Sequence, residues 1–157
     1  MKYLLTSFLA LTLFISCNGD KEIDKQEPEK DYTVENDKEI TDYIAKNKLA
    51  AVKSESGLYY VINEPGTGKQ PTATSNVTVA YKGYYSNGNV FDKSKDEGLS
   101  FGLNQVIKGW TEGITYFKEG GNGILLVPSR LGYGSFDNNG IAGGSVLIFD
   151  VKLIKVN

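Results

Sequence analysis

Histidine and cysteine, two of the usual catalytic side chains, are scarce in this chain. The candidate functional residues are therefore aromatic side chains that stand beside glycine, lysine or aspartate. The 157-residue chain has no histidine and only one cysteine. These counts exclude a Ser-His-Asp or Cys-His triad, zinc sites that need imidazole, an intramolecular disulfide and a cysteine-rich metal cluster. We therefore expect a site that works without a metal or a cofactor.

Five short motifs carry these aromatic residues in a fixed order. They are YKG at 81–83, VFDKS at 90–94, F-x-L-x-QVIKGW at 101–110, VPSRLGYG at 127–134 and LIFDVKL at 147–153. Any one of these aromatic residues alone is most often a core residue. Their repeated placement beside glycine and aspartate is hard to explain by packing alone, and indicates a binding site.

Composition narrows the class of protein further. The chain is 40% hydrophobic and 23% charged, which is typical of a globular protein with one core. Its net charge of −2 gives no basic field for phosphate, so we expect no nucleic-acid partner.

Alternating apolar and polar residues predict a mostly β domain from residue 51 onward. The predicted strands cover 58–62, 77–85, 89–91, 99–103, 121–127 and 145–156, with a hairpin turn at 86–88. Within this domain, apolar residues recur at helical spacing only around 106–117, which predicts one short helix there. The expected fold is α+β: a curved antiparallel sheet wrapped over one short helix.

The first residues have the pattern of an export signal. Lys2 precedes a mostly apolar run over residues 4–15, which is too short to span a ~30 Å hydrocarbon layer. The run ends at Ser16-Cys17, and Cys17 is the only cysteine, so residues 1–16 resemble the signal peptide of a bacterial lipoprotein, with Cys17 as the lipid attachment site. The alternative is an ordinary secretory signal followed by an unrelated cysteine.

Residues 17–50 separate this signal from the predicted domain. Residues 18–50 carry 10 of the 19 acidic residues and 6 of the 17 basic ones. We expect residues 17–33 to form a charged flexible tether, because the segment is too polar to bury enough surface. Apolar residues return at helical spacing over 34–50, which predicts a short amphipathic helix packed on domain 51–157; the alternative is that this helix frays in solution.

The motifs over residues 52–157 resemble those of the FKBP-type peptidyl-prolyl cis-trans isomerases, in the family's order and spacing. QVIKGW and LIFDV are the most specific of them. The resemblance implies an FKBP-like fold for the domain and a cleft that binds proline.

The resemblance also implies the roles of individual residues. The proline ring would stack on Trp110, the backbone N–H of Ile107 would bind a substrate carbonyl, Tyr133 would add a hydrogen bond, and Phe91 with Asp92 would form a wall. By the same resemblance, the catalytic set is Tyr81, Phe91, Asp92, Ile107, Trp110, Tyr133 and Phe149, and the substrate-binding set is Leu99, Phe101, Val106 and Ile141. Asp92 would either orient neighbours such as the Tyr81 hydroxyl or take part in the chemistry directly.

The function implied is isomerisation of X–Pro bonds in folding envelope or secreted proteins. The expected partners are proline-containing unfolded or partly folded polypeptides and macrolide-type inhibitors, and the expected state is a monomer. The expected location is the bacterial envelope, anchored through Cys17 to a membrane, most simply the outer one, and facing the periplasm or the cell surface. Two alternatives remain: a non-enzymatic holdase chaperone, and a structural envelope lipoprotein that uses the same cleft for docking.

Overall fold

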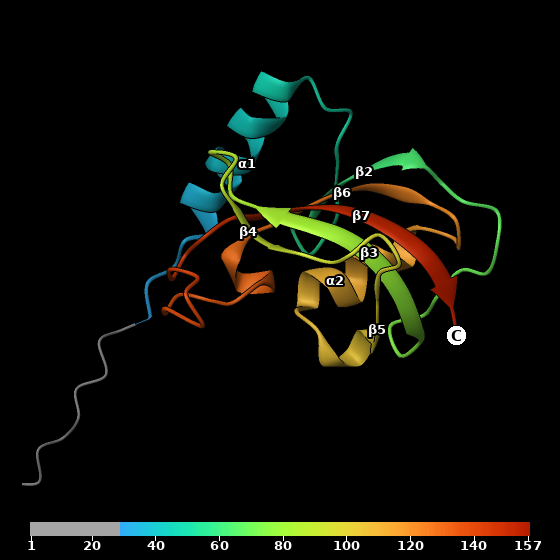
Figure 1. Ribbon diagram of the computed structural model, residues 1–157. Helices are drawn as coiled ribbons and strands as arrows, with labels where there is room; N and C mark the ends of the chain where they lie inside the picture. The colour runs from blue at the N-terminus through green and yellow to red at the C-terminus, as the bar shows by residue number, and fades with distance from the viewer. Residues whose placement is uncertain (1–28) are drawn as a thin grey trace, which may run out of the picture.

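The computed structural model describes residues 29–157 (Figure 1). The predicted signal peptide, Cys17 and the predicted tether up to residue 28 lie outside the described residues. The described part forms an antiparallel sheet with a helix on each side, so the predicted α+β fold is confirmed.

Seven strands make up the sheet, and all of the pairs are antiparallel. The order is β1 (Val52–Lys53), β2 (Tyr59–Glu64), β6 (Asn122–Val127), β7 (Leu147–Val156), β3 (Asn76–Tyr84) and β4 (Val90–Lys93), while β5 (Leu99–Gly102) also pairs with β3. Both β4 and β5 lie along the same edge of β3, at its end and its start respectively, with residues 94–98 between them. The two-residue strand β1 has no signal in the sequence, since alternation needs a longer run.

One face of the sheet packs on the short helix α2 (Lys108–Gly113) and the 3₁₀ turn η2 (Ile114–Tyr116). Residues that alternate along β6 and β7 separate cleanly between the two faces. Leu125 and Phe149 join the core under α2, whereas Leu126 and Ile148 join a second core on the opposite face. Further 3₁₀ turns, η1 (Leu103–Gln105) and η3 (Ser129–Leu131), were not predicted, because three residues carry no periodicity.

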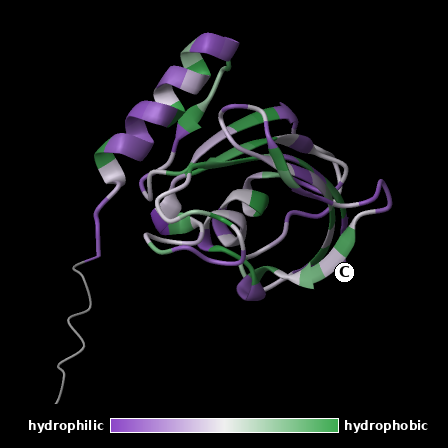
Figure 2. Cartoon of the chain, turned by 60° about the vertical axis from the view of Figure 1, so that its left-hand side comes forward, coloured by the Kyte–Doolittle hydropathy of each residue, from purple (hydrophilic) through white to green (hydrophobic). Residues whose placement is uncertain are grey.

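The second core is covered by helix α1 (Thr33–Asn47), which lies across the sheet from α2 (Figure 1). Hydrophobic and hydrophilic bands alternate along this helix in Figure 2, as expected for one that buries a single face. Ile40 is fully buried, and Tyr43 and Ile44 pack beside it. The helix predicted over 34–50 is therefore present, beginning one residue earlier and ending three residues earlier.

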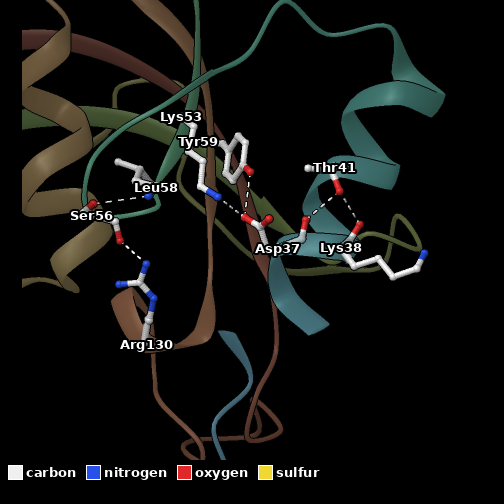
Figure 3. A network of polar contacts seen from close by, with 8 residues as sticks. All are labelled: Asp37, Lys38, Thr41, Lys53, Ser56, Leu58, Tyr59 and Arg130. Carbon is white, nitrogen blue, oxygen red and sulfur yellow. Dashed lines mark hydrogen bonds and ion pairs between the residues drawn. The ribbon is translucent and has the colours of Figure 1, made fainter. Parts of the chain in front are cut away.

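Polar contacts also fasten α1 to the strands (Figure 3). The Asp37 carboxylate accepts hydrogen bonds from Lys53 Nζ at 2.5 Å and from the Tyr59 hydroxyl at 2.8 Å. These two bonds hold the pKa of the Asp37 carboxyl below its usual range. At the other end of the sheet, Ser86 Oγ in the β3–β4 turn donates to Glu39 at 2.5 Å.

We expect α1 to stabilise the fold mainly through the packing of its Ile40 side chain against the sheet. Ile40→Ala should lower the free energy of unfolding in urea by about 2–5 kcal/mol, because it leaves a cavity between α1 and the sheet. The matched change Val34→Ala, at a side chain that is 79% exposed in the same helix, should change it by less than about 0.5 kcal/mol. Equal effects of the two substitutions would mean that α1 is frayed in solution.

Candidate functional site

A cleft opens between the face of the sheet that carries α2 and the first turn of that helix. Its volume is about 450 Å³. It is lined by Tyr81, Phe91, Asp92, Leu99, Phe101, Gln105, Val106, Ile107, Trp110, Tyr133 and Phe149. Ten of the eleven predicted site residues are thus brought together from five elements and two loops, although they span most of the domain's length.

Trp110 on α2 forms the floor of the cleft. Its indole meets the rings of Tyr81 and Phe149 edge-on, with centroids 5.0 Å and 5.2 Å away. The indole is only 5% exposed, yet it lines the cavity. Gly109 makes this placement possible, because a Cβ there would lie 2.6 Å from Val127 Cγ1 and push the helix away from β6.

The wall of the cleft is formed where β3 pairs with β4 and β7. The Phe91 and Phe149 rings meet at 90° with centroids 5.6 Å apart. Both rings lie over Gly83, where a Cβ would come within 2.7 Å of Phe91 and 2.9 Å of Phe149. The glycine in the YKG motif is therefore required for the two rings to pack against each other.

Asp92 supports Tyr81 at the polar side of the wall. The Tyr81 hydroxyl donates to Asp92 Oδ2 at 2.6 Å, and the backbone N–H of Lys93 donates to Asp92 Oδ1 at 2.8 Å. Burial raises the pKa of the Tyr81 hydroxyl above its usual range, and the bond to the Asp92 carboxylate raises it further. The hydroxyl therefore remains a protonated donor at neutral pH, and the geometry favours an orienting role for Asp92.

Two N–H groups near the floor of the cleft have no hydrogen-bond acceptor among residues 29–157. Ile107 caps the start of α2, and its carbonyl accepts hydrogen bonds from the amides of Trp110 and Thr111. Within residues 29–157 the Ile107 amide itself has no hydrogen-bonded acceptor. Trp110 Nε1 is the only buried side-chain nitrogen or oxygen of the described residues without a partner. A buried donor without a partner, as at Trp110 Nε1, is rare in a folded core, and the half-buried Ile107 amide is available to a ligand in the cleft.

The mouth of the cleft is apolar and open to solvent. Leu99 is 51% exposed and Tyr133 is 41% exposed. Gln105 also lines the cleft but was not predicted, although it begins the QVIKGW motif, because an amide side chain gave no signal among apolar neighbours.

Ile141 is the one predicted substrate-binding residue that does not line the cleft. Its side chain is buried in the core with Leu131 and Leu147, and its backbone pairs with Asn138. An apolar residue in a glycine-rich loop can face the core or the cleft, and its type does not distinguish the two.

No acid or base in the cleft is arranged for covalent chemistry. Asp92 is the single carboxylate in the lining. In the part of the chain that the structure describes, no three His, Cys, Asp or Glu residues are grouped to hold a metal ion. The arrangement suits a ligand with a compact apolar group that fills the cleft and an adjacent hydrogen-bond acceptor that reaches the Ile107 amide.

Comparison with known proteins agrees with this geometry. The family model for FKBP-type peptidyl-prolyl cis-trans isomerases matches residues 67–154. The chain belongs to this family. It is 43% identical to the FKBP-type isomerase FkpA of Aeromonas hydrophila over 86% of the chain and 52% of that protein. It is 42% identical to FkpA of Escherichia coli over 76% of the chain and 44% of that protein.

Solved structures of the FKBP family share the fold. The crystal structure of E. coli FkpA superposes with a TM-score of 0.67 at 38% identity, over 79% of this chain and 63% of that one. A peptidyl-prolyl isomerase from Pseudomonas syringae superposes with a TM-score of 0.68 at 30% identity, over 80% of this chain and 96% of that one. The matched part of the chain covers about half or less of the length of these curated FkpA relatives.

The bond between Tyr81 and Asp92 can be tested by titration. In the Asp92→Asn variant we expect the pKa of Tyr81 to fall but to stay above its ordinary value of about 10, because the burial remains. NMR of ¹³C-labelled tyrosine resolves this titration.

Asp150→Asn is the matched control for that titration. Asp150 accepts a hydrogen bond from Tyr84 on the opposite face of the sheet, so this variant should leave the pKa of Tyr81 unchanged. If Asp92→Asn also left it unchanged, the Tyr81–Asp92 contact would not exist in solution.

Proposed function

We propose that this protein is a peptidyl-prolyl cis-trans isomerase that acts on unfolded or partly folded polypeptides. The observation that carries the proposal is the Trp110-floored apolar cleft with the free Ile107 amide at its edge. A proline ring is compact and apolar, and the carbonyl before it is a hydrogen-bond acceptor, so both parts of an X–Pro unit find a partner there.

The reaction needs no nucleophile, because no bond is made or broken. Rotation about the X–Pro bond interrupts amide resonance, with a barrier of ~18–20 kcal/mol. Without a catalyst the exchange takes tens to hundreds of seconds, which is slow enough to limit folding. A chain without histidine is chemically sufficient for such a reaction.

Catalysis follows if the cleft binds the twisted amide more tightly than the planar one. At the twisted geometry the amide loses its charge-separated resonance form and becomes less polar. Rings of Trp110, Phe91 and Phe149 then favour it, whereas the planar amide is better solvated by water. A thousandfold acceleration requires about 4 kcal/mol of this preference.

Individual residues have distinct roles in this scheme. The indole of Trp110 supports the proline ring, and the Ile107 amide holds the substrate carbonyl. Tyr133 adds a hydrogen bond from the open side, while Asp92 positions the Tyr81 hydroxyl. Leu99, Phe101 and Val106 contact the residues that flank the proline.

The partners in this proposal are proline-containing chains, and macrolide-type inhibitors that fill the same cleft. Such substrates are bound one at a time by a single cleft, so we propose that the protein acts as a monomer. A ring-shaped apolar ligand that buries the indole would compete directly with the proline.

The proposed location is the bacterial envelope, with Cys17 as the lipid attachment site and the outer membrane as the anchoring membrane. The chain between Cys17 and Glu29 reaches at most about 40 Å when extended, so the cleft would stay close to the membrane on its periplasmic or outer side. Acyl chains on Cys17 would supply roughly 0.8 kcal/mol of binding per buried CH₂. Among residues 29–157, no helix is both long and apolar enough to cross a bilayer.

Adjacent residues of β4 provide a sharp test of the activity. We expect the full chain to accelerate peptide X–Pro isomerisation, and Phe91→Ala to lower kcat/KM at least about tenfold by removing one wall. Val90→Ala, at an exposed neighbour that does not line the cleft, should leave kcat/KM within about twofold. Equal activity of both variants with the wild type would refute the cleft assignment.

A refolding assay separates isomerase from holdase action. The protein should accelerate the proline-limited phase of a client and should leave a proline-free client unaffected. Equal effects on both clients would indicate a holdase instead.

The lipid anchor is tested by substitution of its only candidate residue. Full-length protein from a lipoprotein-processing bacterium should enter the detergent phase on Triton X-114 partition, and Cys17→Ser should return it to the aqueous phase. If the wild-type chain stayed in the aqueous phase, Cys17 would carry no lipid.

A further inference from the structure

A closed ring of four hydrogen bonds joins the first turn of α1 to the loop that carries Tyr133. Asn36 Oδ1 accepts from the Ser129 amide at 2.7 Å, and the Ser129 carbonyl accepts from the Gly134 amide at 2.8 Å. The Gly134 carbonyl then accepts from the Gly144 amide at 2.9 Å, and the Gly144 carbonyl accepts from Asn36 Nδ2 at 2.8 Å. The loop 129–144, which carries Tyr133, is therefore held at both of its ends by the Asn36 side chain.

The Asn36 side chain lies where both a hydrogen-bond donor and an acceptor are needed. Asn36 is 2% exposed, and it and Ser129 are the only buried polar residues of the described chain. Its carboxamide oxygen accepts from one loop end while its nitrogen donates to the other. Aspartate would leave the Gly144 carbonyl without its donor, and leucine would also leave the buried Ser129 amide without its acceptor.

Residues just before α1 cover the same loop. The Tyr32 ring lies against Gly144, where an added Cβ would approach within 2.4 Å of the ring. Ser135 Oγ donates to the Lys30 carbonyl at 2.8 Å. Residues 29–36, which are distant from the loop in sequence, thus contact it at both ends.

Tyr133 depends on these contacts because its own backbone is permissive. It lies between Gly132 and Gly134, and Gly134 has a φ of +83°. Glycine on both sides adds little restraint of its own, so the backbone at Tyr133 depends on hydrogen bonds. The Gly132 and Gly134 amides both donate to the Ser129 carbonyl, and Ser129 is in turn bonded to Asn36. Tyr133 lines the cleft and is 41% exposed.

We propose that Asn36 is a positioning residue for Tyr133 and couples the N-terminal segment to substrate binding. The inference rests on the proposed isomerase function. It assigns α1 a role besides covering the sheet: whatever displaces residues 29–36 loosens the loop that borders the cleft.

The test compares Asn36→Ala with Ile40→Val in the full-length chain. Both changes are in α1 and both remove buried atoms, but Ile40 contacts the sheet and not the loop. Asn36→Ala should lower kcat/KM for a prolyl peptide roughly tenfold, mainly through KM, whereas Ile40→Val should stay within about twofold. In a Tyr133→Ala background, Asn36→Ala should have little further effect. An equal loss in that background, or no loss alone, would overturn the proposal.

Hydrogen exchange gives a second readout that does not need activity. The amides of Gly134 and Gly144 should exchange faster in Asn36→Ala than in the wild type, and should be unchanged in Ile40→Val. If the wild type has no isomerase activity, the proposed function fails while this measurement still tests the ring. If the wild type is active and the amide exchange in Asn36→Ala is unchanged, the positioning role is wrong.

Discussion

The packing of Trp110 against Tyr81 and Phe149 is the contact on which the rest of the site depends. It joins α2 to β3 and β7, so the helix cannot move relative to the sheet without separating these rings. Because the same turn of α2 presents the Ile107 amide, the apolar floor and the hydrogen-bond donor are fixed together. Rigid aromatic walls around a fixed donor are what preferential binding of a strained amide requires.

The close approach of these rings imposes a second constraint: some neighbouring positions must be glycine, because a side chain there would clash. Gly83 leaves room for the Phe91 and Phe149 rings, and Gly109 allows α2 to lie against Val127. Helix α1 then covers the other face of the sheet, so β6 and β7 are packed on both sides. Phe149 therefore comes to the cleft from a strand that is packed on both faces, while the loop that carries Tyr133 is bonded to Asn36 on α1.

Sequence patterns predicted the elements well where a period or a motif was long enough to detect. The strands that became β3 and β7 alternate over many residues, and QVIKGW marked the floor of the cleft. Short features gave no such signal, as β1 and the 3₁₀ turns show. The family resemblance assigned Ile141 to the cleft, but the fold of its loop buries this side chain in the core. Asn36 gave no signal either, since an asparagine among charged residues on an amphipathic helix looks solvent-facing.

The sequence by itself determined which chemistry is excluded: without histidine and with a single cysteine, the chain lacks histidine-based triads and cysteine clusters, and its aromatic residues supply the apolar surface. Only the tertiary structure decided which of those residues share one cavity. Tyr81, Trp110 and Phe149 meet because the register pairs Gly83 with both Asp92 and Phe149, and because α2 closes over that point. The β3–β4 turn fixes the first of these pairings locally, whereas the β3–β7 pairing and the placement of α2 depend on contacts between segments that are distant in sequence.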